Sequence, residues 1–197
     1  MKRTTSLGAL AIVTLVAVAG IAATSVETTD VRAEAEQAAQ VLQFENLART
    51  VTILQDKFTA LAEAMPEDTY DWQPMEGVRS VSDVYIHISA DNFFVPSLMG
   101  LEAPSGTGIT DDVRTFRAYQ ERDMSKTEAL DAVDASFEFL LGSMEGTRDE
   151  LERSMMLGSS ETTVGDVWIR AVVHLHEHLG QSIAYARSNG VVPPWSM

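Results

Sequence analysis

Apolar positions along the chain recur at helical spacing in four stretches, and no stretch shows the sustained period-two alternation of strands. The first stretch, over 41–65, gathers its apolar residues on one face: Leu42, Leu47, Val51, Leu54, Phe58 and Leu61. Pro66 ends it, because the residue before a proline is driven out of helical conformation. The pattern therefore predicts a long helix over 41–65 and a loop over 66–79.

Capping signals mark where the later helices begin. Ser80 followed by Asp83 is a variant capping box, which predicts a second helix over about 81–94 that ends before Pro96. The next signals predict a loop over 100–112 and a short helix within 112–123. A capping box between Ser125 and Glu128 predicts a third long helix from Ser125 to about Ser154. After a loop over 158–160, a fourth helix is predicted from Thr162 or Thr163 to about Ser188, with Gly190 as its C-terminal cap. Four long helices with short or moderate connections predict an all-α fold, a four-helix bundle.

The start of the chain differs from the rest. Lys2 and Arg3 precede an uncharged apolar run over 7–23 and a few small residues, which is the layout of a secretory signal peptide. We therefore expect a signal peptide over 1–25, with cleavage near residue 25 or after Ala33, and a protein exported to the periplasm or the extracellular space. An uncleaved anchor is the alternative, and only then is stable membrane association expected. A polar, alanine-rich linker is expected over 26–39, and the domain over 40–197.

Charge and cysteine content narrow the classes of function. The formal net charge is −15, so the surface repels nucleic acid and anionic lipid, and neither is expected as a partner. The chain has no cysteine. This excludes structural disulfides, zinc–thiolate sites and a cysteine nucleophile.

Three of the four histidines lie within the fourth helix. His174 and His178 are four residues apart and share a face, whereas His176 is turned roughly 200° away and is excluded as a ligand. His87 lies on an inward stripe of the second helix, with Asp91 one turn later. A histidine facing a His-x-x-x-His pair can hold a metal ion in a bundle core. Buried histidines held only by hydrogen bonds are the alternative.

Longer motifs around these histidines carry a resemblance to a known family. The segment His174-Leu-His-Glu-His178-Leu-Gly180-Gln181 and the tail Pro193-Pro194-Trp195 resemble the last helix and tail of the DinB-like superfamily. The segments Asp71-Trp72-Gln73-Pro74 and Ser80-Val-Ser-Asp-Val-Tyr-Ile-His87-Ile resemble the second helix of that superfamily and the loop before it. The resemblance covers roughly residues 40–197.

This resemblance implies a four-helix bundle with a divalent metal ion held by His87, His174 and His178. The candidates for this metal ion are zinc, nickel, iron and manganese. Characterised relatives include metal-dependent transferases that use small thiols, as well as isomerases and hydrolases, and many form homodimers. Export argues against a thiol transferase here, because small thiols are abundant in the cytoplasm.

Two further residues are candidate helpers at this site. Gln181 lies on the metal-facing side of its helix, where it could bind a metal-bound water, and Asp91 could accept a hydrogen bond from an imidazole. The leading hypothesis is a metal-dependent transferase or hydrolase that activates a thiol or water toward a small molecule. The alternative is a non-catalytic extracytoplasmic module that binds a metal or small ligand.

Overall fold

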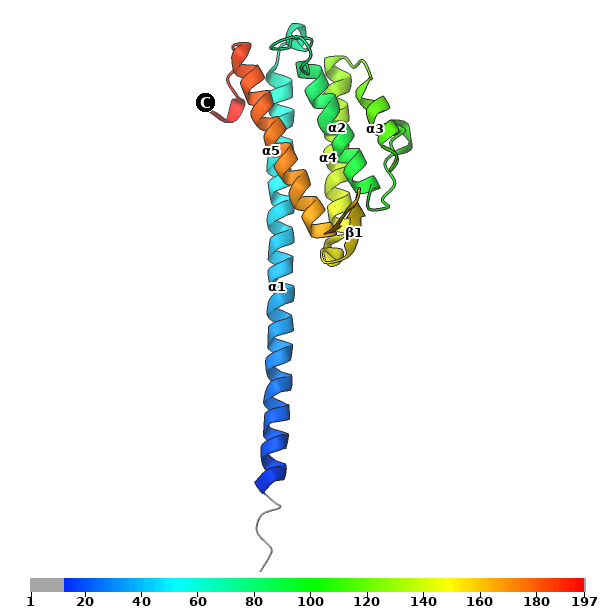
Figure 1. The fold of residues 1–197 in the computed structure, drawn as a ribbon. Helices are drawn as coiled ribbons and strands as arrows, with labels where there is room; N and C mark the ends of the chain where they lie inside the picture. The colour runs from blue at the N-terminus through cyan, green and yellow to red at the C-terminus, as the bar shows by residue number, and fades with distance from the viewer. Residues whose placement is uncertain (1–12, 197) are drawn as a thin grey trace, which may run out of the picture. The chain divides into compact units, whose positions relative to one another are not determined.

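The computed structural model describes residues 13–196, with side chains described from residue 31 onward. The basic start of the expected signal peptide lies outside these residues. The elements are α1 (Val13–Ala64), α2 (Val81–Ser97), α3 (Val113–Gln120), α4 (Lys126–Gly146), β1 (Ser154–Leu157), β2 (Ser160–Thr163) and α5 (Val164–Ser188), with short 3₁₀ turns between them (Figure 1). The prediction of an all-α bundle is confirmed.

The chain divides into two compact units, residues 1–43 and 44–197, and the boundary falls inside α1. Residues 26–39, expected as a linker, are helical. Their composition explains this, because the segment has no glycine or proline and is rich in alanine and glutamate. Within the part of the chain that the structure describes, no helix combines the length and the apolar character needed to cross a membrane.

In the second unit, the part of α1 from Phe44 onward shares one hydrophobic core with α2, α4 and α5. The rings of Phe58 and Phe137 lie 5.8 Å apart, between α1 and α4. Fully buried side chains of this core include Leu54, Leu61, Tyr85, Ile88, Leu140, Met144, Trp168 and Leu175. Each large apolar side chain buried here stabilises the fold by about 1.5–3 kcal/mol. The core therefore fixes α2 and α5, the helices that carry the candidate site.

Two helix ends differ from the sequence prediction. α2 continues through Pro96 to Ser97, because a proline in the last turn removes only one backbone bond, and Ser97 Oγ donates to the Phe94 carbonyl. α4 ends at Gly146 rather than near Ser154. There the Thr147 hydroxyl donates to carbonyls of the last turn and accepts a bond from the buried Trp168 indole.

A short antiparallel hairpin, β1–β2, replaces the expected end of the third helix and the loop after it. Leu157 pairs with Ser160, which leaves Gly158 and Ser159 as a two-residue turn, and Gly158 has a φ of +62°. A positive φ at the first turn position is what a type II′ hairpin requires. The second strand ends at Thr163, whose hydroxyl accepts a bond from the Asp166 amide and caps α5. The hairpin thus sets the point at which α5 begins.

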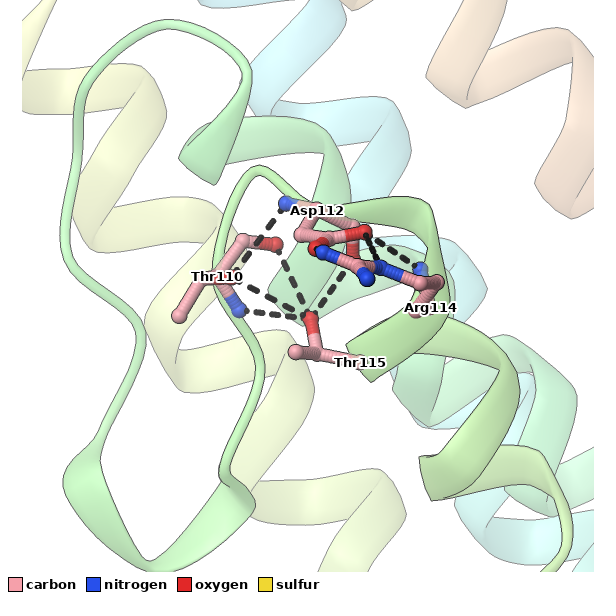
Figure 2. A network of polar contacts seen from close by, with 4 residues as sticks. All are labelled: Thr110, Asp112, Arg114 and Thr115. Carbon is pink, nitrogen blue, oxygen red and sulfur yellow. Dashed lines mark hydrogen bonds and ion pairs between the residues drawn. The ribbon is translucent and has the colours of Figure 1, made fainter.

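The first turn of α3 is held by a local polar network (Figure 2). Asp112 accepts bonds from the Arg114 amide and guanidinium, and these bonds lower the pKa of its carboxyl to about 2. Thr115 Oγ1 accepts a bond from the Thr110 amide. Tyr119 then packs in a second, smaller apolar cluster with residues of α2. The last residue of α3, Gln120, is thereby brought beside His87.

Candidate metal site

The three predicted histidines meet where α2 and α5 pack together. The ring centroids of His87 and His178 are 4.6 Å apart, those of His174 and His178 4.5 Å, and those of His87 and His174 5.3 Å. One ring nitrogen from each histidine lies within 4.8 Å of the others. His176 lies outside this group, and its Nδ1 faces the Val172 carbonyl at 2.8 Å.

An antiparallel register between α2 and α5 produces this meeting. His87 lies against His178, while Asp91, one turn later in α2, lies against His174, one turn earlier in α5. The start of α2 is fixed by the predicted capping box, in which Ser80 Oγ accepts from the Asp83 amide and the Asp83 carboxylate accepts from the Ser80 amide. The register between α2 and α5, together with the residue at which each helix begins, determines which turns of the two helices face each other.

Burial keeps two of the histidines neutral. His87 is 7% exposed and His178 is 9% exposed. Burial lowers the pKa of His87 to about 4, with the Arg79 guanidinium acting in the same direction and Asp91 opposing it. Burial also lowers the pKa of His178. Both imidazoles are therefore neutral at neutral pH, which is the form that can ligate a metal ion.

Asp91 lies between the two helices at the cluster. Its Oδ2 is 2.8 Å from Nε2 of His174 and 3.0 Å from Nε2 of His87. The hydrogen bond to Asp91 raises the pKa of His174, against the effect of burial. On the other side of that ring, Glu177 is 3.7 Å from Nδ1, which is too long for a hydrogen bond. In the metal-free protein, His174 therefore donates its Nε2 proton to Asp91.

A chain of hydrogen bonds assigns the tautomer of His178. The Arg79 backbone carbonyl can only accept, so the Tyr185 hydroxyl, 3.1 Å away, donates to it. That hydroxyl then accepts from Nε2 of Gln181 at 2.9 Å. The carbonyl oxygen of Gln181 consequently faces Nδ1 of His178 at 2.8 Å and must accept its proton. His178 is left with an unprotonated Nε2.

The outer nitrogen of His87 has a similar partner. Its Nδ1 lies 2.7 Å from Oε1 of Gln120 and 3.3 Å from the Arg79 guanidinium, which also donates to Gln120 at 3.3 Å. Arg79 can only donate, and the amide oxygen can only accept, so the two partners favour opposite tautomers. The shorter contact decides, and Nδ1 of His87 donates to Gln120. Its Nε2 lone pair then faces Asp91.

These assignments make the centre of the cluster rich in lone pairs. The Nε2 atoms of His87 and His178 are acceptors, and so is the carboxylate of Asp91, while the proton on His174 can be lost. A group of acceptors that face one another is satisfied by a cation. Neutral imidazoles whose other nitrogen donates to an oxygen are the usual arrangement of histidine ligands in metal sites. The donor set therefore fits a divalent ion that accepts nitrogen ligands.

The two candidate helper residues, Asp91 and Gln181, both contact histidines of the cluster. Asp91 contacts the ligand candidates as expected from the sequence. Gln181, for which a hydrogen bond to a metal-bound water was one possibility, accepts a hydrogen bond from the outer nitrogen of His178. Sequence reasoning missed Arg79, Gln120 and the network role of Tyr185. No local pattern marks Arg79 or Gln120, since each reaches His87 only through tertiary packing. Gln181 and Tyr185 are four residues apart and therefore share a face of α5.

Comparisons with known proteins agree with this fold. A family model described as the DinB superfamily matches residues 50–182. The solved structure of a DinB-like protein from Bacillus subtilis is similar, with a TM-score of 0.55 and 18% identity, over 74% of this chain and 92% of that chain. A DinB-like protein from Bacillus cereus gives a TM-score of 0.59 and 12% identity, over 76% of this chain and 95% of that chain.

At these identities the structural likeness concerns the fold alone. No curated protein matches the chain. The family assignment comes from the sequence model, whose match spans more than half of the 197 residues. The protein belongs to the DinB superfamily.

Proposed function

We propose that His87, His174 and His178 hold a divalent metal ion and that the protein is a metal-dependent enzyme acting on a small molecule. The observation that supports this most is that one ring nitrogen from each histidine lies within 4.8 Å of the others. Two of the imidazoles are neutral through burial and donate to oxygens from their outer nitrogens. If hydrogen bonds alone held the three histidines together, the ring nitrogens at the centre of the cluster would not need to be unprotonated. Zinc, nickel, iron and manganese are all compatible with this donor set.

A bound divalent ion would supply Lewis acidity, lowering the pKa of a water or thiol that reaches it. The protein's own residues prepare for this role. Gln181 and Gln120 orient the rings of His178 and His87 through their outer nitrogens. Asp91 holds His174 in place and offsets part of the ion's positive charge. Three protein ligands leave coordination positions open, as catalytic sites require.

A second candidate function is a non-catalytic module that captures a metal ion or small ligand. The observation that favours it is the lack of a histidine base beside the cluster. Among the described residues, His176 is the histidine outside the cluster, and it faces the Val172 carbonyl instead. Asp91 is the nearest carboxylate, and it already accepts a hydrogen bond from His174.

An activity screen on metal-loaded protein separates the two functions. The substrates are hydrolysable esters and amides first, then pairs of a small thiol and an electrophile. The enzyme proposal predicts turnover that is lost in His174→Ala and retained in His176→Ala, a control on the same helix that leaves the cluster intact. Tight metal retention without turnover of any substrate would contradict the enzyme and support the binding module.

We further propose that the protein acts outside the cytoplasm on a small molecule, without nucleic acid as a partner. The predicted signal peptide and the formal charge of −15 are the basis for this. Fractionation of cells that express the full chain tests it. Recovery of the protein in the cytoplasm with residues 1–25 still attached would contradict export.

A further inference from the structure

A cavity adjoins the histidine cluster on one side. It has a volume of about 430 Å³, lies between α2, α4, α5 and β1, and includes His174 and Asp91 in its wall. Pockets for small molecules typically have volumes of about 300–1,000 Å³. The size and position therefore suit a ligand that extends from the histidines.

The register of the two helices gives this cavity its length. About one helical turn from Asp91 and His174, the lining positions include Val95 on α2 and Ala171 on α5, and about two turns away they include Leu98 and Val167. Seven residues separate Asp91 from Leu98, which corresponds to about 10 Å along a helix. The cavity thus runs from the histidines toward the hairpin, where Leu157 of β1 contributes to the wall. Its shape fits an elongated body.

The polarity of the cavity changes along that length. The walls away from the histidines are mainly aliphatic, whereas Asp91 and His174 lie at the histidine end, and Arg170 and Glu177 each lie about one turn of α5 from His174, on opposite sides of it. Arg170 lies one turn before His174 on the same face of α5. Its guanidinium has no hydrogen bond or ion pair with another residue in the described part of the chain.

The charges at the polar end predict which head group is preferred. With neutral histidines, Asp91, Glu177 and Arg170 sum to one negative charge. A divalent ion reverses this to one positive charge. A ligand with an anionic head is therefore favoured only when the metal ion is present.

We propose that this cavity is the ligand pocket of the metal site and that it takes a small amphiphile with an apolar body and one anionic head, of the size of a medium-chain carboxylate. The inference rests on the proposed metal site. The head lies at the His174 and Asp91 end, and the body lies along the aliphatic walls toward Leu157.

Calorimetric titration of zinc-loaded protein with butanoate, hexanoate and octanoate tests whether the cavity binds the apolar body of the ligand. Burying one methylene contributes about 0.8 kcal/mol, so affinity rises roughly fourfold for each added carbon until the cavity is filled. Octylamine tests the head, and we expect it to bind the zinc-loaded protein at least tenfold more weakly than octanoate. Equal affinity across the carboxylate series would overturn the proposal without any variant.

Filling the cavity provides the second test. Ala171 is half-buried in the wall, and Ala171→Trp is expected to weaken octanoate binding at least tenfold. Ala184→Trp is the matched control, because Ala184 is exposed on the same helix and lies outside the cavity. Circular dichroism and zinc content are measured for both variants. An octanoate affinity that Ala171→Trp leaves unchanged, in folded protein with zinc bound, would overturn the proposal.

The zinc-uptake measurement and the carboxylate titration together distinguish a failure of the proposed pocket from a failure of the proposed metal site. Zinc uptake without chain-length dependence contradicts the pocket and leaves the metal site standing. Protein that takes up no zinc, nickel, iron or manganese contradicts the metal site, and the preference for an anionic head is then overturned with it.

Discussion

Oδ2 of Asp91 lies 2.8 Å from Nε2 of His174, and this contact joins α2 to α5 at the histidine cluster. The same oxygen is 3.0 Å from Nε2 of His87. One carboxylate thus contacts two of the three candidate ligands, on the nitrogens that face the centre. In the metal-free protein, His174 donates its Nε2 proton to this carboxylate, and that proton would have to leave if Nε2 bound an ion.

Replacing Asp91 with asparagine removes the charge and keeps the shape of the side chain. We expect the pKa of His174 to fall in the metal-free protein, because the bond that raises it is weakened. Zinc affinity is expected to fall by about 10–100-fold, as for other residues that orient ligands. Nuclear magnetic resonance titration and zinc competition measure the two effects. The control is Glu177→Gln, an exposed carboxylate near His174, and an equal effect there would contradict the role of Asp91.

Removing the Tyr185 hydroxyl tests the chain that assigns the His178 tautomer. Tyr185→Phe keeps the ring against Trp72 but frees the Gln181 amide to rotate. We expect the ¹⁵N spectrum of His178 to change from a protonated Nδ1 to a mixture of tautomers, and zinc affinity to fall. In the control, Tyr70→Phe, the hydroxyl that is lost donates to the Ala62 carbonyl and takes no part in the chain of hydrogen bonds to His178. A His178 spectrum unchanged by Tyr185→Phe would refute the assignment.

The low pKa of His87 predicts a pH dependence of stability in metal-free protein. Its pKa is 6.5 when unfolded and about 4 when folded, so between these values the unfolded state binds more protons. The stabilisation is complete above pH 6.5 and is lost as the pH falls toward 4. The full loss attributable to His87 is about 3 kcal/mol.

Comparison with His87→Gln isolates this effect from the other titrating groups. Urea unfolding in the presence of a chelator gives the free energy of unfolding of both proteins at each pH. The wild type should lose stability relative to the variant between pH 6.5 and 4. A constant difference across this range would mean that His87 is not desolvated in the folded protein.

The bond between Thr147 and Trp168 should matter for stability rather than for metal binding. Trp168 is fully buried, and its indole nitrogen donates to Thr147 Oγ1 at 3.0 Å. Thr147→Val is isosteric and leaves that donor unpaired, which costs about 1–3 kcal/mol. Thr52→Val, on an exposed turn of α1, should change stability by less than about 0.5 kcal/mol. Equal denaturation midpoints for the two variants would contradict this.

Helix periodicity was enough to predict much of the candidate site. The spacing of His174 and His178, and the inward stripe of His87 and Asp91, depend only on the geometry of single helices. The capping box at Ser80 predicted the start of α2 correctly for the same reason, since both partners lie within one turn.

Features that depend on contacts distant in sequence could not be predicted in this way. Gln120 reaches His87 because α3 packs on α2, and nothing within 113–120 indicates that partner. The end of α4 depends on Thr147 bonding to Trp168, which is 21 residues away. The hairpin was missed although its Gly-Ser turn is a known signal, because its strands have only four residues each and their buried face is small.

The measurement that tests the account most directly is the metal content of the protein, purified without a histidine tag. The account predicts about one equivalent of a divalent transition metal per chain, lost in His174→Ala and retained in His176→Ala. Wild-type protein that contains no metal and takes up no added zinc, nickel, iron or manganese would contradict it. The three histidines would then be hydrogen-bonded residues of a DinB-type bundle.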